Sequence, residues 1–304
     1  MNGRRYLLLW LPPLLLQSAD AHAWGLLTHV YFAQWLLWTL PLADPNLRRA
    51  VQKFPELVMA GACLPDLALI SPAFRDTHRW DHIQALMRGA RNDEESAVAL
   101  GYASHLLVDV VAHNHFVPAH EAMWFDKTLL THVTSEWAVD AHIADMVTTS
   151  PHRLLRDHCA TLAPIVARRF RCTSHRAEKA IVRLANADRL LRTARLPHIL
   201  YSTFRRLDRR VFEHFVYYVS QTQAMLEKID VVLEGGLPSW EADPRHAPET
   251  LRELRHFSLA QLNERHPAPV ALFMPQAGGA AYISRKEALA INAPMTAPAS
   301  TSLG

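Results

Sequence analysis

The sequence predicts an all-α protein with one folded domain. Apolar residues recur at helical spacing along most of the chain, as in the stripe formed by Phe204, Leu207, Val211, Phe215 and Tyr218. Strand-type alternation is nearly absent, and only Pro269 to Met274 has the pattern of a short extended segment. With 304 residues, of which 50% are hydrophobic, the chain can bury one substantial core. A prior of about 150 residues per domain would also allow two domains, but the helical pattern without an internal repeat favours one.

Residues 1–23 have the pattern of a secretory signal. Arg4 and Arg5 form a charged start, Tyr6 to Leu16 an apolar segment, and Ala21-His22-Ala23 an A-x-A cleavage site, so the mature chain is expected to begin at Trp24. The apolar segment is too short to span a membrane, and no later stretch reaches about 18 uninterrupted apolar residues. We therefore expect a secreted or periplasmic protein without a transmembrane segment; the alternative is an uncleaved membrane anchor.

The first helices are predicted from apolar periodicity and proline positions. Leu26 to Leu40 is densely apolar and suits a mostly buried helix. Asp44-Pro45 starts a second helix, from Asn46 to about Ala60, because proline suits the first helical turn. The segment Gly61 to Asp66 then breaks the periodicity, which puts Asp66 in a loop or at a helix end.

The central helix is predicted from a capping signal. Asn92 followed by Glu95 matches a capping box, so this helix is expected from about Asp93 to Ala112. A further helix is expected from about Leu129 to Val147, ended by Ser150-Pro151.

The second half of the chain continues the helical pattern. Helices are expected at about 152–170, 174–194, 202–233 and 249–263, and the final residues 293–304 have a disordered composition. The folded domain is therefore expected to span residues 24–292.

Composition restricts the kinds of partner and metal ligand. A formal charge of +3 is only mildly basic and does not by itself indicate a nucleic-acid or membrane partner. The three cysteines, Cys63, Cys159 and Cys172, contain no C-x-x-C pair, although Cys159 and Cys172 could form a disulfide in an oxidising compartment. Any metal is therefore expected to be bound by histidine, of which the chain has 18, and by carboxylates.

Two helical segments carry histidine and carboxylate four residues apart. In YASHLLVDVVAHNH, His105 and Asp109 lie on one helical face and His115 follows closely. In the later helix His132 and Glu136 repeat this spacing. Each pair places two ligands on adjacent turns, which is the geometry that a metal needs from a helix, so the sequence predicts a metal centre.

The order of these residues resembles the zinc-dependent phospholipases C and their relatives, the single-strand-specific zinc nucleases. The expected mature start, Trp24-Gly25-Leu26-Leu27-Thr28-His29, is similar to the family's WGxxxH opening. Asp66, His78 in THRWD, HxxxDxxxxxH and HxxxE follow in the family's order. The resemblance covers residues 24–136 and implies an all-α, multi-helix single domain.

Carried over residue by residue, the resemblance implies three zinc ions. One would be bound by Asp66, His78 and His105, and a second by His29 and the amine and carbonyl oxygen of Trp24, with Asp109 bridging the two. The third would be bound by His115, His132 and Glu136, and His82 is an alternative to His78.

The resemblance also implies a mechanism. Water acidified by two cations would supply the hydroxide that attacks phosphorus, with Asp66 and Asp109 as the catalytic carboxylates. Asp66 is expected to accept a proton from this water.

The leading hypothesis is a phospholipase C that cleaves glycerophospholipids at a membrane surface to diacylglycerol and a phosphorylated headgroup. The segments HNHFVPAHE and THRWDH, which resemble the bacterial zinc phospholipases more than the nucleases, favour this hypothesis. Phe116, Trp124 and Phe125 could contact acyl chains, although core packing is the simpler interpretation of aromatic residues.

Two alternatives remain open at this point. A zinc nuclease is favoured by WGLLTH and by two basic clusters, Arg168-Arg169-Arg171 and Arg205-Arg206 with Arg209-Arg210, although a solvated helix face explains such clusters more simply. A metal-binding domain without catalysis is opposed by the complete ligand set. Four further residues are expected at the surface or behind the ligands, namely His113, His120, Asp140 and His142.

Overall fold

A computed structural model describes residues 25–39, 42–117, 128–207, 211–238, 240–243 and 282–283. The all-α prediction is confirmed: the described chain is helical apart from turns and one pair of two-residue strands, β1 (Leu237–Pro238) and antiparallel β2 (Tyr282–Ile283). The predictions for residues 1–23, 249–263, 269–274 and 293–304 lie outside the described residues.

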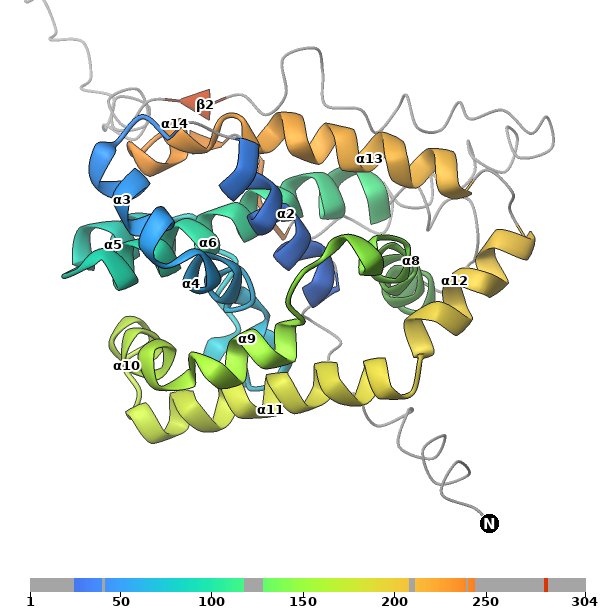
Figure 1. The fold of residues 1–304 in the computed structure, drawn as a ribbon, viewed down its shortest axis with the longest axis horizontal. Coiled ribbons are helices and arrows are strands. Elements are labelled where there is room, and N and C mark those ends of the chain that lie inside the picture. Colours follow the sequence, from blue (N-terminus) through green and yellow to red (C-terminus); the bar gives the residue numbers. More distant parts are fainter. Residues whose placement is uncertain are drawn as a thin grey trace, which may run out of the picture.

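One helix, α6 (Asp93–Val111), forms the centre of the fold, and every residue from Ala97 to Val111 is buried. Figure 1 shows it surrounded by other helices, with α13 running along one side. The helices packed against it are α2 (Leu26–Thr39), α3 (Pro45–Lys53), α4 (Pro55–Gly61), α5 (Asp81–Gly89), α13 (Val211–Leu226) and α14 (Ile229–Leu233). A side chain on α6 can therefore meet groups from several elements.

The remaining helices form a second group around this centre. They are α8 (Thr128–Ile143), the 3-10 turn η4 (Ala144–Met146), α9 (Pro151–Asp157), α10 (Cys159–Arg169), α11 (Ser174–Thr193) and α12 (Leu196–Leu207). In Figure 1, α9, α10 and α11 lie on the side opposite α13, and α12 packs against α8.

Two glycines allow α4 and α6 to touch backbone to backbone. A Cβ on Gly101 would collide with the carbonyl oxygen of Val58, and a Cβ on Gly61 would collide with that of Val98. Any larger residue would push the two helices apart. This close crossing places the start of the segment after α4, which carries Asp66, against the middle of α6.

The predicted cap of α6 is half confirmed. The side chain of Asn92 accepts a hydrogen bond from the Glu95 N–H at 2.9 Å, as an N-cap should. The Glu95 carboxylate, however, accepts from the backbone N–H of Arg91 and from the side chains of Arg91 and Arg168 rather than returning to Asn92. The reciprocal bond of a capping box is replaced by an ion-pair cluster.

Several predicted helix boundaries are wrong, in each case for a local reason. The helix expected at 46–60 is divided at Phe54, because Pro55 starts a new helix and cannot donate within the old one. The helix expected at 152–170 is divided at His158 into α9 and α10. The central helix agrees with its prediction, since α6 ends at Val111, and a π-helical turn, η3 (Ala112–Phe116), follows it.

The helix expected at 202–233 begins earlier and is not continuous. Arg195 has a left-handed backbone (φ 54°), which ends the preceding segment, and α12 begins at Leu196 with proline in its first turn. Residues 208–210 lie outside the described chain, and α13 and α14 are separate helices. The expected apolar stripe is present where side chains are described, since Phe215 and Tyr218 are buried.

Two further features bear on the sequence predictions. By length and composition one described helix, Asp93–Asn114, could cross a membrane, but 94% of its apolar window is buried inside the protein, as is usual for the core helix of a folded domain. The cysteines Cys63, Cys159 and Cys172 are all free, so the possible disulfide between Cys159 and Cys172 is not formed.

Candidate metal centre

Five of the predicted ligands meet at the middle of α6. His105 and Asp109 come from α6 itself and His29 from α2. Asp66 lies in the 3-10 helix η1 (Pro65–Leu69), and His78 in the turn before α5. His29, Asp66, His105 and Asp109 are buried, with exposed fractions of 0–1%.

The Asp109 carboxylate lies between two groups of histidines. Its Oδ2 is 2.9 Å from His105 Nε2 and 3.3 Å from His78 Nε2. Its Oδ1 is 3.4 Å from His29 Nε2 and 3.7 Å from His113 Nε2. Each oxygen thus faces a different histidine pair, which is the arrangement expected of a carboxylate that bridges two cations.

The hydrogen-bond partners fix which ring nitrogens of His105 and His78 carry the lone pairs. The carbonyl oxygen of Ala62 can only accept, so His105 Nδ1, 2.7 Å away, must donate to it. The Thr77 hydroxyl donates its proton to the carbonyl oxygen of Pro65, so it accepts from His78 Nδ1 at 3.2 Å. In the neutral rings both Nε2 atoms therefore carry lone pairs, which is the form that binds metals.

These two lone-pair nitrogens point at the same place. His78 Nε2 and His105 Nε2 are 3.2 Å apart, where neutral rings of this tautomer would repel each other. A cation between them converts the repulsion into coordination, because zinc takes histidine nitrogens at about 2.0–2.1 Å. Asp66 completes this side, since ligand atoms of Asp66, His78 and His105 all lie within 4.8 Å of one another. His29, His105 and Asp109 satisfy the same condition.

The buried polar atoms of the cluster fit a metal site. Within the described chain neither ring nitrogen of His29 and neither carboxylate oxygen of Asp66 has a hydrogen-bond partner. A buried polar group without a partner costs about 1–3 kcal/mol, more if it is charged, so four such atoms in one cluster need an explanation. A bound divalent cation supplies it, because these nitrogens and oxygens are zinc ligands.

Burial and mutual charge set the protonation of the cluster. Burial, reinforced by the neighbouring His105, holds the pKa of His29 well below its usual range, which keeps this ring neutral. Burial raises the pKa of Asp66 to about 7 despite the opposing effect of His105. For Asp109 burial acts in the same direction, but His105 and His29 outweigh it and hold the pKa well below its usual range.

The structure places the ring of His78, and not that of His82, at the cluster. Although burial opposes it, the contact with Asp109 raises the pKa of His78, and the ring belongs to the cluster. His82 Nε2 instead donates to the carbonyl oxygen of Asp76 at 2.6 Å, and its ring lies against Phe170 with the centroids 5.0 Å apart. His82 is therefore a packing residue.

The remaining predicted ligands are only partly described. Glu136 is buried on α8, with an exposed fraction of 3%. The backbone positions of His132 on α8 and His115 in η3 are described, but their side chains lie outside the description, as does the whole of Trp24.

Two of the residues expected at the surface or behind the ligands, His113 and Asp140, are buried. His113 faces Asp109, and the signal that could have found it is its spacing of four residues from Asp109. Asp140 is buried and bonds to the start of α2, and His142 contacts Tyr201. Phe116 is fully buried, so it packs in the core rather than contacting acyl chains. His120, Trp124 and Phe125 lie outside the described residues.

Two arginines of the first basic cluster are held in ion pairs, whereas Arg171, Arg205 and Arg206 are exposed. Arg168 pairs with Glu95 at 2.7 Å and Arg169 with Asp81 at 3.4 Å. These ion pairs agree with the simpler interpretation of a charged, solvated helix face.

The fold and the cluster together define an all-α protein with a candidate multi-histidine metal centre built around one buried helix. The comparison with protein families is specific: the family model for zinc-dependent phospholipase C matches residues 28–187, more than half of the 304-residue chain. The chain belongs to this zinc-dependent phospholipase C family. Searches of the curated proteins and of the solved structures gave no significant match.

Proposed function

We propose that this protein is an exported phospholipase C that hydrolyses glycerophospholipids to diacylglycerol and a phosphorylated headgroup. The family implies a lipid substrate and a zinc-dependent reaction. The observation that carries the proposal is the 3.2 Å approach of His78 Nε2 to His105 Nε2 beside the Asp109 carboxylate. A cation between the two nitrogens would remove their repulsion, and the family to which the chain belongs is zinc-dependent.

The proposed ligand sets follow the geometry around Asp109. Asp66, His78 and His105 would hold one ion on the Oδ2 side, and His29 with the amine and carbonyl oxygen of Trp24 a second on the Oδ1 side. A third ion is proposed at His115, His132 and Glu136. Because Trp24 would bind through its α-amine, complete loading requires removal of residues 1–23.

The chemistry of the site follows from its charges and its burial. Zinc, when bound, acidifies water and neutralises the charge on the phosphate oxygens. Asp66 would lie beside the attacking water as well as beside the ion, and its carboxylate oxygens have no hydrogen-bond partner among the described residues, so it is proposed as the proton acceptor. Asp109 stays ionised, so its two oxygens remain available as ligands, one beside His78 and His105 and the other beside His29. The buried apolar side chains of α2 and α6 limit the access of bulk water to His29, His105 and Asp109.

The test is zinc content and N-terminal mass of protein processed by its host, combined with hydrolysis of phosphatidylcholine vesicles and of single-stranded DNA. We expect about three zinc ions on a chain that starts at Trp24, with diacylglycerol released from vesicles. Activity on DNA alone would establish the nuclease instead. A folded, correctly processed chain that binds no zinc would overturn the proposal.

A substitution at the cluster controls for contaminating activity. His78→Ala should remove the hydrolysis of phosphatidylcholine, while His82→Ala, four residues away and outside the cluster, should retain it. Equal activity of the two variants would assign the hydrolysis to another protein in the preparation.

A further inference from the structure

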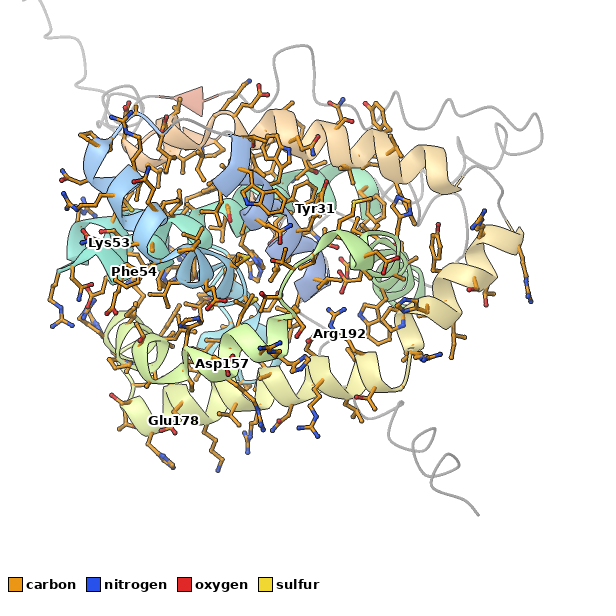
Figure 2. The ribbon with its side chains drawn as sticks, in the orientation of Figure 1. Tyr31, Lys53, Phe54, Asp157, Glu178 and Arg192 are labelled. Atoms are coloured by element: carbon orange, nitrogen blue, oxygen red, sulfur yellow. The ribbon has the colours of Figure 1, made fainter. Side chains whose placement is uncertain are left out.

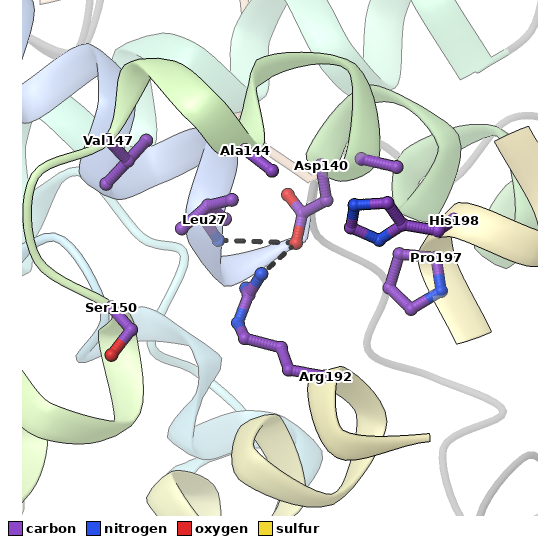
Figure 3. A pocket seen from close by; sticks show the side chains of 9 residues that line it. Leu27, Asp140, Ala144, Val147, Ser150, Arg192, Pro197 and His198 are labelled. Atoms are coloured by element: carbon purple, nitrogen blue, oxygen red, sulfur yellow. Dashed lines mark hydrogen bonds and ion pairs between the residues drawn. The ribbon is translucent and has the colours of Figure 1, made fainter. Parts of the chain in front are cut away.

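The first turn of α2 is held by a carboxylate from a distant part of the chain. Asp140, on α8, accepts hydrogen bonds at its Oδ1 from the Thr28 N–H at 2.9 Å and the Thr28 hydroxyl at 2.7 Å. Its Oδ2 accepts from the Leu27 N–H at 3.4 Å. Figure 3 shows dashed lines from Leu27 and from Arg192 that meet at one oxygen of Asp140. The Thr28 N–H also bonds to the Gly25 carbonyl oxygen at 2.9 Å, so it is shared between two acceptors, whereas the Leu27 N–H at the start of the helix has the carboxylate as its described acceptor.

The backbone just before this turn fits tightly against the same carboxylate. A Cβ on Gly25 would overlap the carboxyl carbon and both oxygens of Asp140. Only glycine lets the chain pass this close, which gives a physical reason for the glycine that follows Trp24. Because Gly25 and Thr28 both contact Asp140, the whole start of α2 is fixed relative to α8.

Arg192 provides the opposite charge that makes this buried carboxylate acceptable. Its Nη2 lies 3.2 Å from Asp140 Oδ2, and its Nε lies 2.8 Å from Asp188 Oδ1. Glu178 is on the outer face of α11, whereas Arg192 of the same helix reaches inward (Figure 2). A cavity of about 230 Å³ borders Asp140 and Arg192, and the arginine side chain remains 22% exposed. Partial hydration lowers the cost of burying these charges.

This anchor is adjacent to the candidate metal ligands on both helices. His29 follows Thr28 directly, and its ring stacks on His105 with the centroids 3.6 Å apart. On α8, Asp140 lies one helical turn after Glu136. A shift of the α2 start would therefore move His29 away from Asp109, and the same contact ties α2 to the helix that carries Glu136.

We propose that Asp140 is a positioning residue for the metal centre. Together with Arg192 it fixes the start of α2, so that His29 is presented to the ion on the Oδ1 side of Asp109. This inference rests on the proposed function only in requiring that the cluster binds zinc. Asp140 is not itself a proposed ligand, and its part is to hold a ligand-bearing helix in place.

Asp140→Asn is the main test, with Asp188→Asn as its matched control. In the asparagine variant one oxygen becomes an NH₂ group, and in either amide orientation that group faces two donors. Asp188 is equally buried and pairs with the same arginine, but its described contacts do not include α2. The readouts are zinc affinity by chelator competition, the visible spectrum of the cobalt-substituted protein, and thermal unfolding of the metal-free protein.

We expect Asp140→Asn to lower the affinity for one zinc ion by about 10–100-fold, which is the usual effect of losing a residue that orients metal ligands. The cobalt spectrum should change as well. Asp188→Asn should lower the unfolding temperature of the metal-free protein while leaving zinc affinity and the cobalt spectrum as in the natural chain. Equal zinc affinity in both variants would overturn the inference while leaving the proposed function intact, provided the natural chain binds zinc.

Two further variants keep the test decisive if Asp140→Asn does not fold. Thr28→Val removes only the hydroxyl donor and should lower the affinity for the same zinc ion to a smaller extent. Gly25→Ala should also lower this zinc affinity, because the new methyl group displaces the start of α2 from the Asp140 carboxylate. N-terminal mass must establish that Gly25→Ala is cleaved before Trp24. A correctly processed Gly25→Ala chain with natural zinc affinity would contradict the positioning role.

Discussion

The imidazole ring of His29 lies flat against the ring of His105, with the centroids 3.6 Å apart and an angle of 14° between the planes. The two residues come from different helices, and their Nε2 atoms approach opposite oxygens of Asp109. The ring spacing is comparable with the separation of about 3.5–4 Å between the ions of two-metal sites. Burial and the neighbouring His105 hold the pKa of His29 well below its usual range, so the His29 ring of this stack is neutral and able to bind a metal.

The choice of His78 over His82 gives a direct prediction of metal content. His78→Ala should lower the affinity for one zinc ion by more than about 100-fold, so that this ion is lost on purification. Mutation of residues that only hold the ligands already lowers metal affinity by about 10–100-fold. His82→Ala should retain the natural zinc content, since His82 donates to the carbonyl oxygen of Asp76. Elemental analysis of the two purified variants checks this. Loss of zinc from His82→Ala alone would reverse the assignment.

Thr77 orients His78, and its hydroxyl can be removed without changing the shape of the side chain. Thr77→Val removes the acceptor of the His78 Nδ1 proton and should weaken zinc binding by about 10–100-fold. Thr222→Val is a matched control, because Thr222 is also fully buried but bonds within α13 to the carbonyl oxygen of Tyr218. Chelator competition should separate the two variants. Equal affinities would show that the Thr77 hydroxyl does not orient the ring.

The contact between α4 and α6 predicts a large difference between two glycine substitutions. Gly101→Ala should destabilise the protein by about 1–3 kcal/mol or more, because the methyl group meets the backbone of Val58, which cannot move aside cheaply. Gly89→Ala has open space within 4 Å and an ordinary helical backbone, so it should be neutral or stabilising by up to about 1 kcal/mol. Denaturant unfolding of both variants measures the difference. Similar unfolding midpoints would mean that the two helices are not in backbone contact.

Glu95 predicts a dependence of stability on pH. Burial would raise its pKa, but the bonds from Arg91 and Arg168 outweigh burial and lower the pKa below its usual value. A carboxylate with a lowered pKa in the folded state stabilises the protein above its unfolded pKa of about 4.3. That contribution is lost as the pH falls through the lower folded pKa.

Glu95→Gln should therefore cost about 1–2 kcal/mol near neutral pH, the lower part of the range for charge-assisted bonds because both arginines are partly exposed. The difference from the natural chain should shrink below about pH 4. Glu94→Gln, its neighbour in the first turn of α6, has no bond among the described residues and should show little effect at any pH. Urea unfolding between pH 3 and 7 tests this, and a cost that stays constant with pH would contradict it.

The sequence by itself determined the features that depend on local geometry. The four-residue spacing of His105 and Asp109 places both on one face of any helix, so the ligand pair of α6 could be predicted without a fold. The all-α class followed in the same way, because it rests on apolar periodicity along each segment. Helix boundaries were less certain, and the segments expected at 46–60 and 152–170 are divided before Pro55 and at His158.

Only the tertiary structure decided the features that depend on contacts between distant segments. The spacing could not choose between His78 and His82, since the choice depends on which ring the turn before α5 directs at α6. Asp140 could not be predicted as the anchor of α2, because the two are 112 residues apart in sequence. Such contacts are fixed by the packing of whole helices, which sums many weak interactions that no short segment contains.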